Sequence, residues 1–305
     1  MLTTITPERL TSSVLAVPPL CRNTDYSLNP AENTKLIRHI EAAGVDTLLY
    51  GGNANFYHIG AAEYEKVLSL LETAAAPNSL VIPSVGPTFG TMMDQAPILR
   101  RHKFPTAMLL PMQGASTSEG IDIGIRRFVD SAGIPAVLYV RAENYIEPAR
   151  IAKLFNDKVI CLVKYALVRK DPLDDPYLRA ICDQCDPKRI VSGLGEQPAI
   201  AHMRHFRLGG FTSGVICVAP HVSAACLRAI RAENWTEADR LRELCLPLES
   251  LRNAGSPIRV LHEAVRLANI ANTGPLLPLL TNIPSAEHPR LAEVSKAFLQ
   301  LNHSA

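Results

Sequence analysis

One lysine stands in an otherwise apolar segment of the chain. Residues 159–168 read V-I-C-L-V-K-Y-A-L-V, and Lys164 is the only charged residue among them. Such a run is typical of a buried β-strand, where burial disfavours the ammonium form and lowers the pKa of a lysine. A neutral amine attacks carbonyl carbons and forms Schiff bases. The segment therefore indicates that Lys164 is a nucleophile toward a carbonyl compound.

Tyr139 is a second candidate for chemistry. It lies in the apolar run 135–140, one expected strand before Lys164, so adjacent strands would bring the two side chains together. A phenol at that place can transfer protons during imine formation and during loss of a leaving group. Structural alternatives stay open for both residues. A strand-end lysine can form a salt bridge or extend to solvent, and a tyrosine can fill the core with its hydroxyl satisfied locally.

Short apolar runs alternate with amphipathic stretches of helical length along most of the chain. The expected strands are 13–17, 46–50, 80–85, 107–111, 135–140, 159–168, 189–193 and 210–215. The expected helices that follow them are about 29–44, 61–76, 91–102, 117–132, 147–156, 173–184, 197–207 and 220–232. This eightfold alternation predicts an α/β fold of the (β/α)8 TIM-barrel type. A doubly wound open sheet is the alternative, but its Gly-rich dinucleotide loop has no counterpart after an early strand.

The end of the chain predicts helices only, over 236–252, 256–272 and 288–302. No flexible Gly/Ser linker separates them from the rest. We therefore expect a barrel over 1–232 and a C-terminal helical layer, 233–305, packed on it.

Composition excludes several classes of function. The chain has 305 residues with a net charge of +2, which gives no electrostatic footprint for nucleic acid or a membrane surface. The N-terminus lacks a secretory signal pattern. Several of the seven cysteines lie in apolar runs, which favours reduced thiols and a cytoplasmic location. Cys182 and Cys185 have the spacing of metal ligands, but no second C-x-x-C pair exists, so we expect no metal.

Polar residues also mark other strand ends, where the active sites of such barrels lie. Gly52 and Asn53 follow the second expected strand, and Gln113 follows the fourth. Thr212 and Ser213 lie in the eighth. These residues are candidates for the wall of a site around Lys164.

The order of these segments resembles the dihydrodipicolinate synthase / N-acetylneuraminate lyase superfamily of class I aldolases. The resemblance runs from about residue 12 to 232 and into the helical tail. The superfamily's G-T-T-G-E loop corresponds to Gly51–Asn55, and its strand end with the catalytic tyrosine corresponds to Leu138-Tyr139-Val140. Its Schiff-base lysine motif corresponds to Cys161–Lys164, and its G-x-I-S-x-x-x-N-x-x-P segment corresponds to Gly210–Pro220.

The resemblance implies a pyruvate-like 2-oxo acid bound as an imine of Lys164, with Tyr139 transferring protons. It implies that Gly52 and Asn53 hold the carboxylate, while Thr212 and Ser213 line the wall. It further implies a homotetramer, a dimer of dimers, without metal or organic cofactor. The small net charge and the lack of a long apolar run predict no nucleic-acid or membrane partner.

Departures from the family pattern bear on the substrate. Gly52 and Asn53 replace the two threonines, and Gln113 stands in the Pro111-Met112-Gln113 segment where the biosynthetic synthases have P-Y-Y. Asn144 replaces the synthases' arginine for a second carboxylate, and Arg141 would need a different loop path to substitute for it. The preferred interpretation is an aldolase or dehydratase acting on a 2-oxo-3-deoxy sugar acid. The alternatives are 4-hydroxy-tetrahydrodipicolinate synthase, which joins pyruvate and aspartate semialdehyde, and a catalytically impaired 2-oxo acid binding protein.

Overall fold

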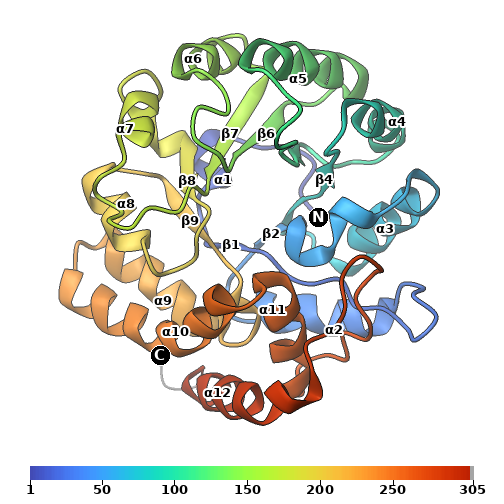
Figure 1. Ribbon diagram of the computed structural model, residues 1–305, viewed down its shortest axis with the longest axis vertical. Helices are drawn as coiled ribbons and strands as arrows, with labels where there is room; N and C mark the ends of the chain where they lie inside the picture. Colours follow the sequence, from blue (N-terminus) through green and yellow to red (C-terminus); the bar gives the residue numbers. More distant parts are fainter. Residues whose placement is uncertain (303–305) are drawn as a thin grey trace.

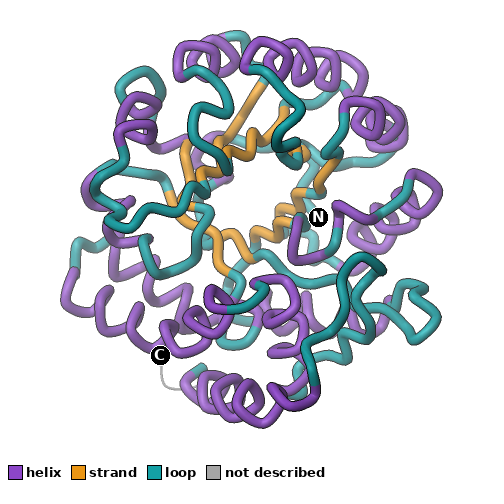
Figure 2. Tube along the Cα trace, in the orientation of Figure 1, coloured by secondary structure: helices purple, strands orange, loops and turns teal. Residues whose placement is uncertain are grey.

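Nine short parallel strands form a ring at the centre of the molecule (Figure 2). The computed structural model describes residues 1–302. The sheet order is β3-β2-β1-β9-β8-β7-β6-β5-β4, and every strand residue is buried. The strands are β1 (Leu15–Ala16), β2 (Thr47–Leu49), β3 (Leu80–Ile82), β4 (Ser84–Val85), β5 (Ala107–Leu109), β6 (Ala136–Val140), β7 (Ile160–Tyr165), β8 (Ile190–Ser192) and β9 (Gly210–Ser213).

The two strands at the ends of this order, β3 and β4, follow one another in the chain. Only Pro83 separates them, and proline cannot donate to a strand ladder. β3 pairs with β2 on one side and β4 pairs with β5 on the other. The interrupted strand therefore joins the two ends of the sheet, and the nine strands correspond to the eight predicted ones. The predicted TIM barrel is confirmed.

Helices surround the ring of strands (Figure 1). They are α1 (Pro7–Leu10), α2 (Pro30–Glu41), α3 (Ala61–Ala74), α4 (Phe89–Arg100), α5 (Ser118–Ala132), α6 (Pro148–Asn156), α7 (Pro176–Cys182), α8 (Ala199–His205) and α9 (Pro220–Arg231). Capping follows the sequence: the Asn29 side chain accepts from the N–H of Glu32, and Pro30 occupies the first turn of α2. The predicted helix at 173–184 begins later, at Pro176, because Asp175 is its cap and accepts from the N–H of Leu178.

Three further helices pack beside the barrel: α10 (Trp235–Ala254), α11 (Pro257–Leu267) and α12 (His288–Leu301). α10 contacts α9, and α11 contacts the short 3₁₀ helix η1 (Gly52–Ala54) that follows β2. Figure 1 shows α11 next to the end of the barrel that carries the strand-end loops. The helical extension therefore reaches the loops where an active site is expected. No helix within residues 1–302 is long and apolar enough to cross a membrane.

Candidate active site

Lys164 and Tyr139 lie side by side at the carboxyl ends of adjacent strands. They are direct partners in the β6–β7 register. The Lys164 Nζ lies 4.3 Å from the centre of the Tyr139 ring. Both side chains are buried, with 7% and 9% of their surface exposed. The proximity predicted from the strand count is confirmed.

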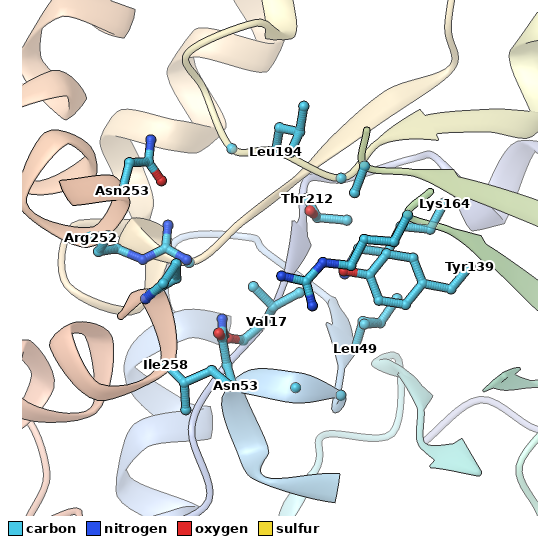
Figure 3. A pocket seen from close by; sticks show the side chains of 18 of the residues that line it. Val17, Leu49, Asn53, Tyr139, Lys164, Leu194, Thr212, Arg252, Asn253 and Ile258 are labelled. Carbon is cyan, nitrogen blue, oxygen red and sulfur yellow. Dashed lines mark hydrogen bonds between the residues drawn. The ribbon is translucent and has the colours of Figure 1, made fainter. Parts of the chain in front are cut away.

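A cavity of about 350 Å³ opens at this place (Figure 3). The lining comes from the ends of β2, β6, β7 and β9, from the segments after β1, β2, β6, β7, β8 and β9, and from the junction between α10 and α11. Its residues are Val17, Leu49, Gly51, Gly52, Asn53, Tyr57, Tyr139, Arg141, Lys164, Ala166, Val168, Gly193, Leu194, Gly195, Thr212, Gly214, Arg252, Asn253, Ser256, Pro257 and Ile258. The size suits a small organic acid.

The Lys164 amine is shifted toward its neutral form. Burial is the largest cause, and the positive charges of Arg141 and Arg252 add to it, so the pKa of Lys164 falls to about 7. The charge would be unpaired and poorly hydrated at this depth. At neutral pH a large share of the amine is therefore unprotonated and nucleophilic.

The Tyr139 phenol is shifted the other way. Burial raises the pKa of Tyr139 to about 12, against a smaller opposing effect of Arg141. The group is a protonated phenol at neutral pH. It can donate a proton to a leaving hydroxyl and take one back within the cavity.

Gly193, just after β8, makes room for the lysine side chain. A Cβ at this position would lie 2.8 Å from the Cβ of Ala166 and 3.0 Å from the Cε of Lys164. Carbon atoms do not approach so closely without displacement. The glycine therefore permits the position that Lys164 takes over Tyr139.

Gly52 and Asn53 line the cavity as the first residues of η1. Their N–H groups have no acceptor within that helix, because the first N–H groups of a helix lack a preceding turn. The Asn53 side chain donates from Nδ2 to the carbonyl oxygen of Val17 at 2.9 Å. This hydrogen bond ties the loop after β2 to the segment that follows β1.

The other predicted site residues divide between two places. Thr212 lines the cavity, whereas the hydroxyl of Ser213 accepts from the N–H of Ile216 at 3.0 Å and is fully buried. Gln113 and Asn144 line a different surface cavity of about 470 Å³, formed by the loops after β5 and β6. The structure thus brings Gly52, Asn53, Thr212, Tyr139 and Lys164 together but not Gln113 and Asn144.

Five polar residues of the cavity were not predicted: Tyr57, Arg141, Arg252, Asn253 and Ser256. Arg141 follows Tyr139 by two residues, and the period of a strand places such residues on the same face. That spacing was a usable signal. Arg252 belongs to α10, and no local pattern in the sequence indicates that this helix reaches the barrel mouth.

Comparison with solved structures identifies the fold. Dihydrodipicolinate synthase from Bacillus clausii superposes with a TM-score of 0.82 at 19% identity, covering 95% of this chain and 99% of that one. N-acetylneuraminate lyase from Fusobacterium nucleatum gives 0.79 at 14% identity, covering 95% and 99%. YagE from E. coli K12, solved in complex with pyruvate, gives 0.79 at 18% identity, covering 94% and 98%. The chain has the fold of the dihydrodipicolinate synthase / N-acetylneuraminate lyase superfamily, which confirms the resemblance.

Sequence relatives point to one group within that class. A probable 5-dehydro-4-deoxyglucarate dehydratase from Saccharopolyspora erythraea is 26% identical, covering 95% of both chains. A second from Pseudomonas putida strain F1 is 24% identical, covering 93% of this chain and 94% of the relative. No protein-family model matches the chain.

Proposed function

We propose that the protein is a class I lyase, most specifically a dehydratase, that binds a 2-oxo-3-deoxy sugar acid as an imine of Lys164. The observation that carries this proposal is the buried Lys164 amine over the Tyr139 ring, within a cavity at the carboxyl end of the barrel. The dehydratase names of the sequence relatives support the reaction class.

The chemistry requires only the groups of this cavity. The Lys164 amine adds to the ketone carbon, and the resulting hydroxyl leaves as water with a proton from Tyr139. The phenolate then takes a proton from the neighbouring CH2, which gives an enamine. The enamine expels the next hydroxyl as a second water, again with the proton of Tyr139. Addition of one water hydrolyses the imine and releases Lys164, so the substrate loses one water in total.

The substrate carboxylate next to the ketone has donors at the loop after β2. Gly52 and Asn53 line the cavity at the start of η1, where their N–H groups have no acceptor within the helix, and Thr212 adds a hydroxyl-bearing side chain from β9. These groups suit an anion held beside Lys164. We do not assign Ser213 such a contact, because its hydroxyl is engaged within the backbone after β9.

The relatives' printed substrate, 5-dehydro-4-deoxyglucarate, is a six-carbon sugar diacid with a ketone beside one carboxylate. We propose a substrate of this kind. Incubation with the compound should give a product that has lost water, detected by mass spectrometry, and K164A should give none. Turnover by K164A would refute the proposed role of the lysine.

Two outcomes of the same incubation separate the alternatives. Release of pyruvate would indicate aldol cleavage of the same imine. No turnover, together with robust condensation of pyruvate and aspartate semialdehyde, would indicate the biosynthetic synthase. Binding of 2-oxo acids without any turnover would indicate a binding protein.

We also propose a cytoplasmic homotetramer. The resemblance to the superfamily supports the assembly, and Phe89 and Ile123, each 53% exposed, present apolar surface around α4 and α5. All seven cysteines are free thiols, which suits a reducing compartment. Light scattering on the purified chain measures the mass of the assembly.

A further inference from the structure

The cavity around Lys164 carries more positive charge than one carboxylate requires. Arg141 and Arg252 both line it, and no aspartate or glutamate is among its lining residues. In the proposed function, the carboxylate beside the ketone is held at Gly52 and Asn53. Arginine binds carboxylates through paired N–H groups, so the additional guanidinium charge fits a second anionic group on the ligand.

Arg252 lies where it could bind a second anionic group of the ligand. It lies near the end of α10 and is 8% exposed. Figure 3 shows it on the opposite side of the cavity from Lys164. Its guanidinium rests against the backbone at Gly214, where a Cβ would lie 2.6 Å from the Arg252 Cζ. The glycine therefore lets the guanidinium lie flat against the cavity wall.

The hydrogen-bond donors of the Arg252 side chain are not satisfied by other protein groups. Its Nε is buried and has no hydrogen-bond partner within residues 1–302. A buried charged donor without an acceptor is costly for the folded state. The two terminal nitrogens of Arg252 also form no hydrogen bond with residues 1–302, and a ligand carboxylate in the cavity would supply an acceptor for them.

Two buried carboxylates, Glu249 and Glu196, contact each other's residues, and the charge of Arg252 acts on Glu249. Glu249 accepts from the N–H of Glu196 at 3.0 Å, and the Ser223 hydroxyl donates to Glu196. Burial, and after it the charge of Glu196, raise the pKa of Glu249 well above its usual range, while Arg252 opposes the shift. Glu249 is thus shifted toward its neutral form and forms no ion pair with Arg252, so the guanidinium stays available to a ligand.

We infer that Arg252 is a specificity-determining residue that binds a second carboxylate of the substrate, at the end away from the ketone. The ligand class is a dicarboxylic 2-oxo acid long enough to cross the cavity from Lys164 to Arg252. The inference rests on the proposed function, since it takes the ketone to be held at Lys164.

The test compares two acids that differ only at the far end. 2-Oxoadipate and 2-oxohexanoate are six-carbon 2-oxo acids with and without a second carboxylate. Reductive trapping with borohydride on the full-length protein gives the half-saturating concentration of each for the adduct on Lys164. We expect the diacid to saturate at a concentration about tenfold or more below that of the monoacid, as a charged hydrogen-bonded pair provides.

Substitutions then assign the preference to a residue. R252Q should abolish the diacid preference, and R252K should restore part of it. R240Q is the matched control, because Arg240 lies on the same helix, is 54% exposed and pairs with Glu237 outside the cavity. G214A is a second route that keeps the charge: its Cβ would displace the guanidinium and should also reduce the preference. If R252Q does not fold, G214A replaces it in the test.

The outcomes separate failure of the inference about Arg252 from failure of the proposed function. Equal saturation by diacid and monoacid in the parent protein would overturn the inference, as would an unchanged preference in R252Q or in a folded G214A. Pyruvate serves as the reference acid, because it has no far end. If pyruvate forms no adduct on Lys164 in the parent protein, the proposed function itself fails. If R252Q traps pyruvate normally but loses the diacid preference, the proposed function and the role of Arg252 are both supported.

Discussion

At the scale of residues, the main feature of the site is the Lys164 amine, whose pKa is lowered by three causes. Burial of Lys164 has the largest effect, and Arg141 and Arg252 add like charge across the cavity. The same arginines would attract an anionic substrate. The cavity can thus bind an anion and lower the pKa of its nucleophile with the same groups.

This arrangement fixes a pH dependence. With the pKa of Lys164 lowered to about 7, the amine is protonated below that pH and neutral above it. The rate of imine formation with pyruvate should therefore rise through about pH 7 and level off, whereas an ordinary lysine would continue to gain up to pH ~10. R141Q removes one like charge and should move the midpoint upward. Trapping rates measured across this range check both, and a midpoint near pH ~10 in the parent protein would be inconsistent with the proposed environment.

Removal of the phenol should affect chemistry more than folding. The Tyr139 hydroxyl makes no hydrogen bond with another side chain or backbone group that the structure describes, so Y139F leaves no protein partner unsatisfied. Loss of a positioned proton donor typically costs about 10²–10⁴-fold in rate. We expect kcat to fall in that range while the thermal midpoint stays near that of the parent. A variant with parental kcat would exclude Tyr139 from proton transfer.

At the scale of elements, the strand ends carry the site because β6, β7 and β8 present their last residues in register. Gly193, after β8, leaves space for the Lys164 side chain, because a Cβ at this position would lie too close to Ala166 and to Lys164. G193A should therefore push the lysine from its place and slow imine formation, without removing any reacting group. G60A is the matched control, because nothing lies within 4 Å of a Cβ at that glycine. Equal trapping rates in the two variants would show that this packing is unimportant.

The elements themselves were predictable from the sequence to a large extent. Alternating apolar runs and amphipathic stretches gave the strands and helices, because each has its own hydrophobic period. The segment 80–85 was expected as one strand, and Pro83 divides it because proline lacks the N–H that the ladder needs. Lys164 and Tyr139 were predictable because a polar residue in a buried strand is conspicuous.

The rest of the site depends on contacts between distant segments. Arg252 and Ile258 enter the cavity only because the end of α10 and the start of α11 pack over the barrel. Their local sequence is that of an ordinary amphipathic helix and its turn. Gln113 and Asn144 were expected near the lysine from the family pattern, and the loops after β5 and β6 place them in a separate cavity. Loop paths of this kind are set by packing and have no period to read.

At the scale of the whole molecule, one cavity joins the barrel to its helical extension. Residues from β1 to α11 contact the same space, so a bound ligand should stabilise the chain as a unit. Pyruvate at about 100 times its Kd should add about 2.7 kcal/mol to the free energy of unfolding. For a chain of this length, we expect the thermal midpoint to rise by roughly 2–5 °C.

Lactate is the control for this measurement, because it has the same carboxylate and no ketone. Differential scanning calorimetry with each acid checks the expectation. An equal rise with lactate would mean that the carboxylate alone is bound and that no imine forms.

The central claim is that Lys164 forms the imine, and reductive trapping tests it most directly. The protein is incubated with pyruvate and borohydride, digested and mapped by mass spectrometry. We expect the reduced pyruvyl adduct on Lys164 alone, and none anywhere in K164A. Absence of an adduct in the parent protein, or an adduct on a different lysine, would contradict the claim.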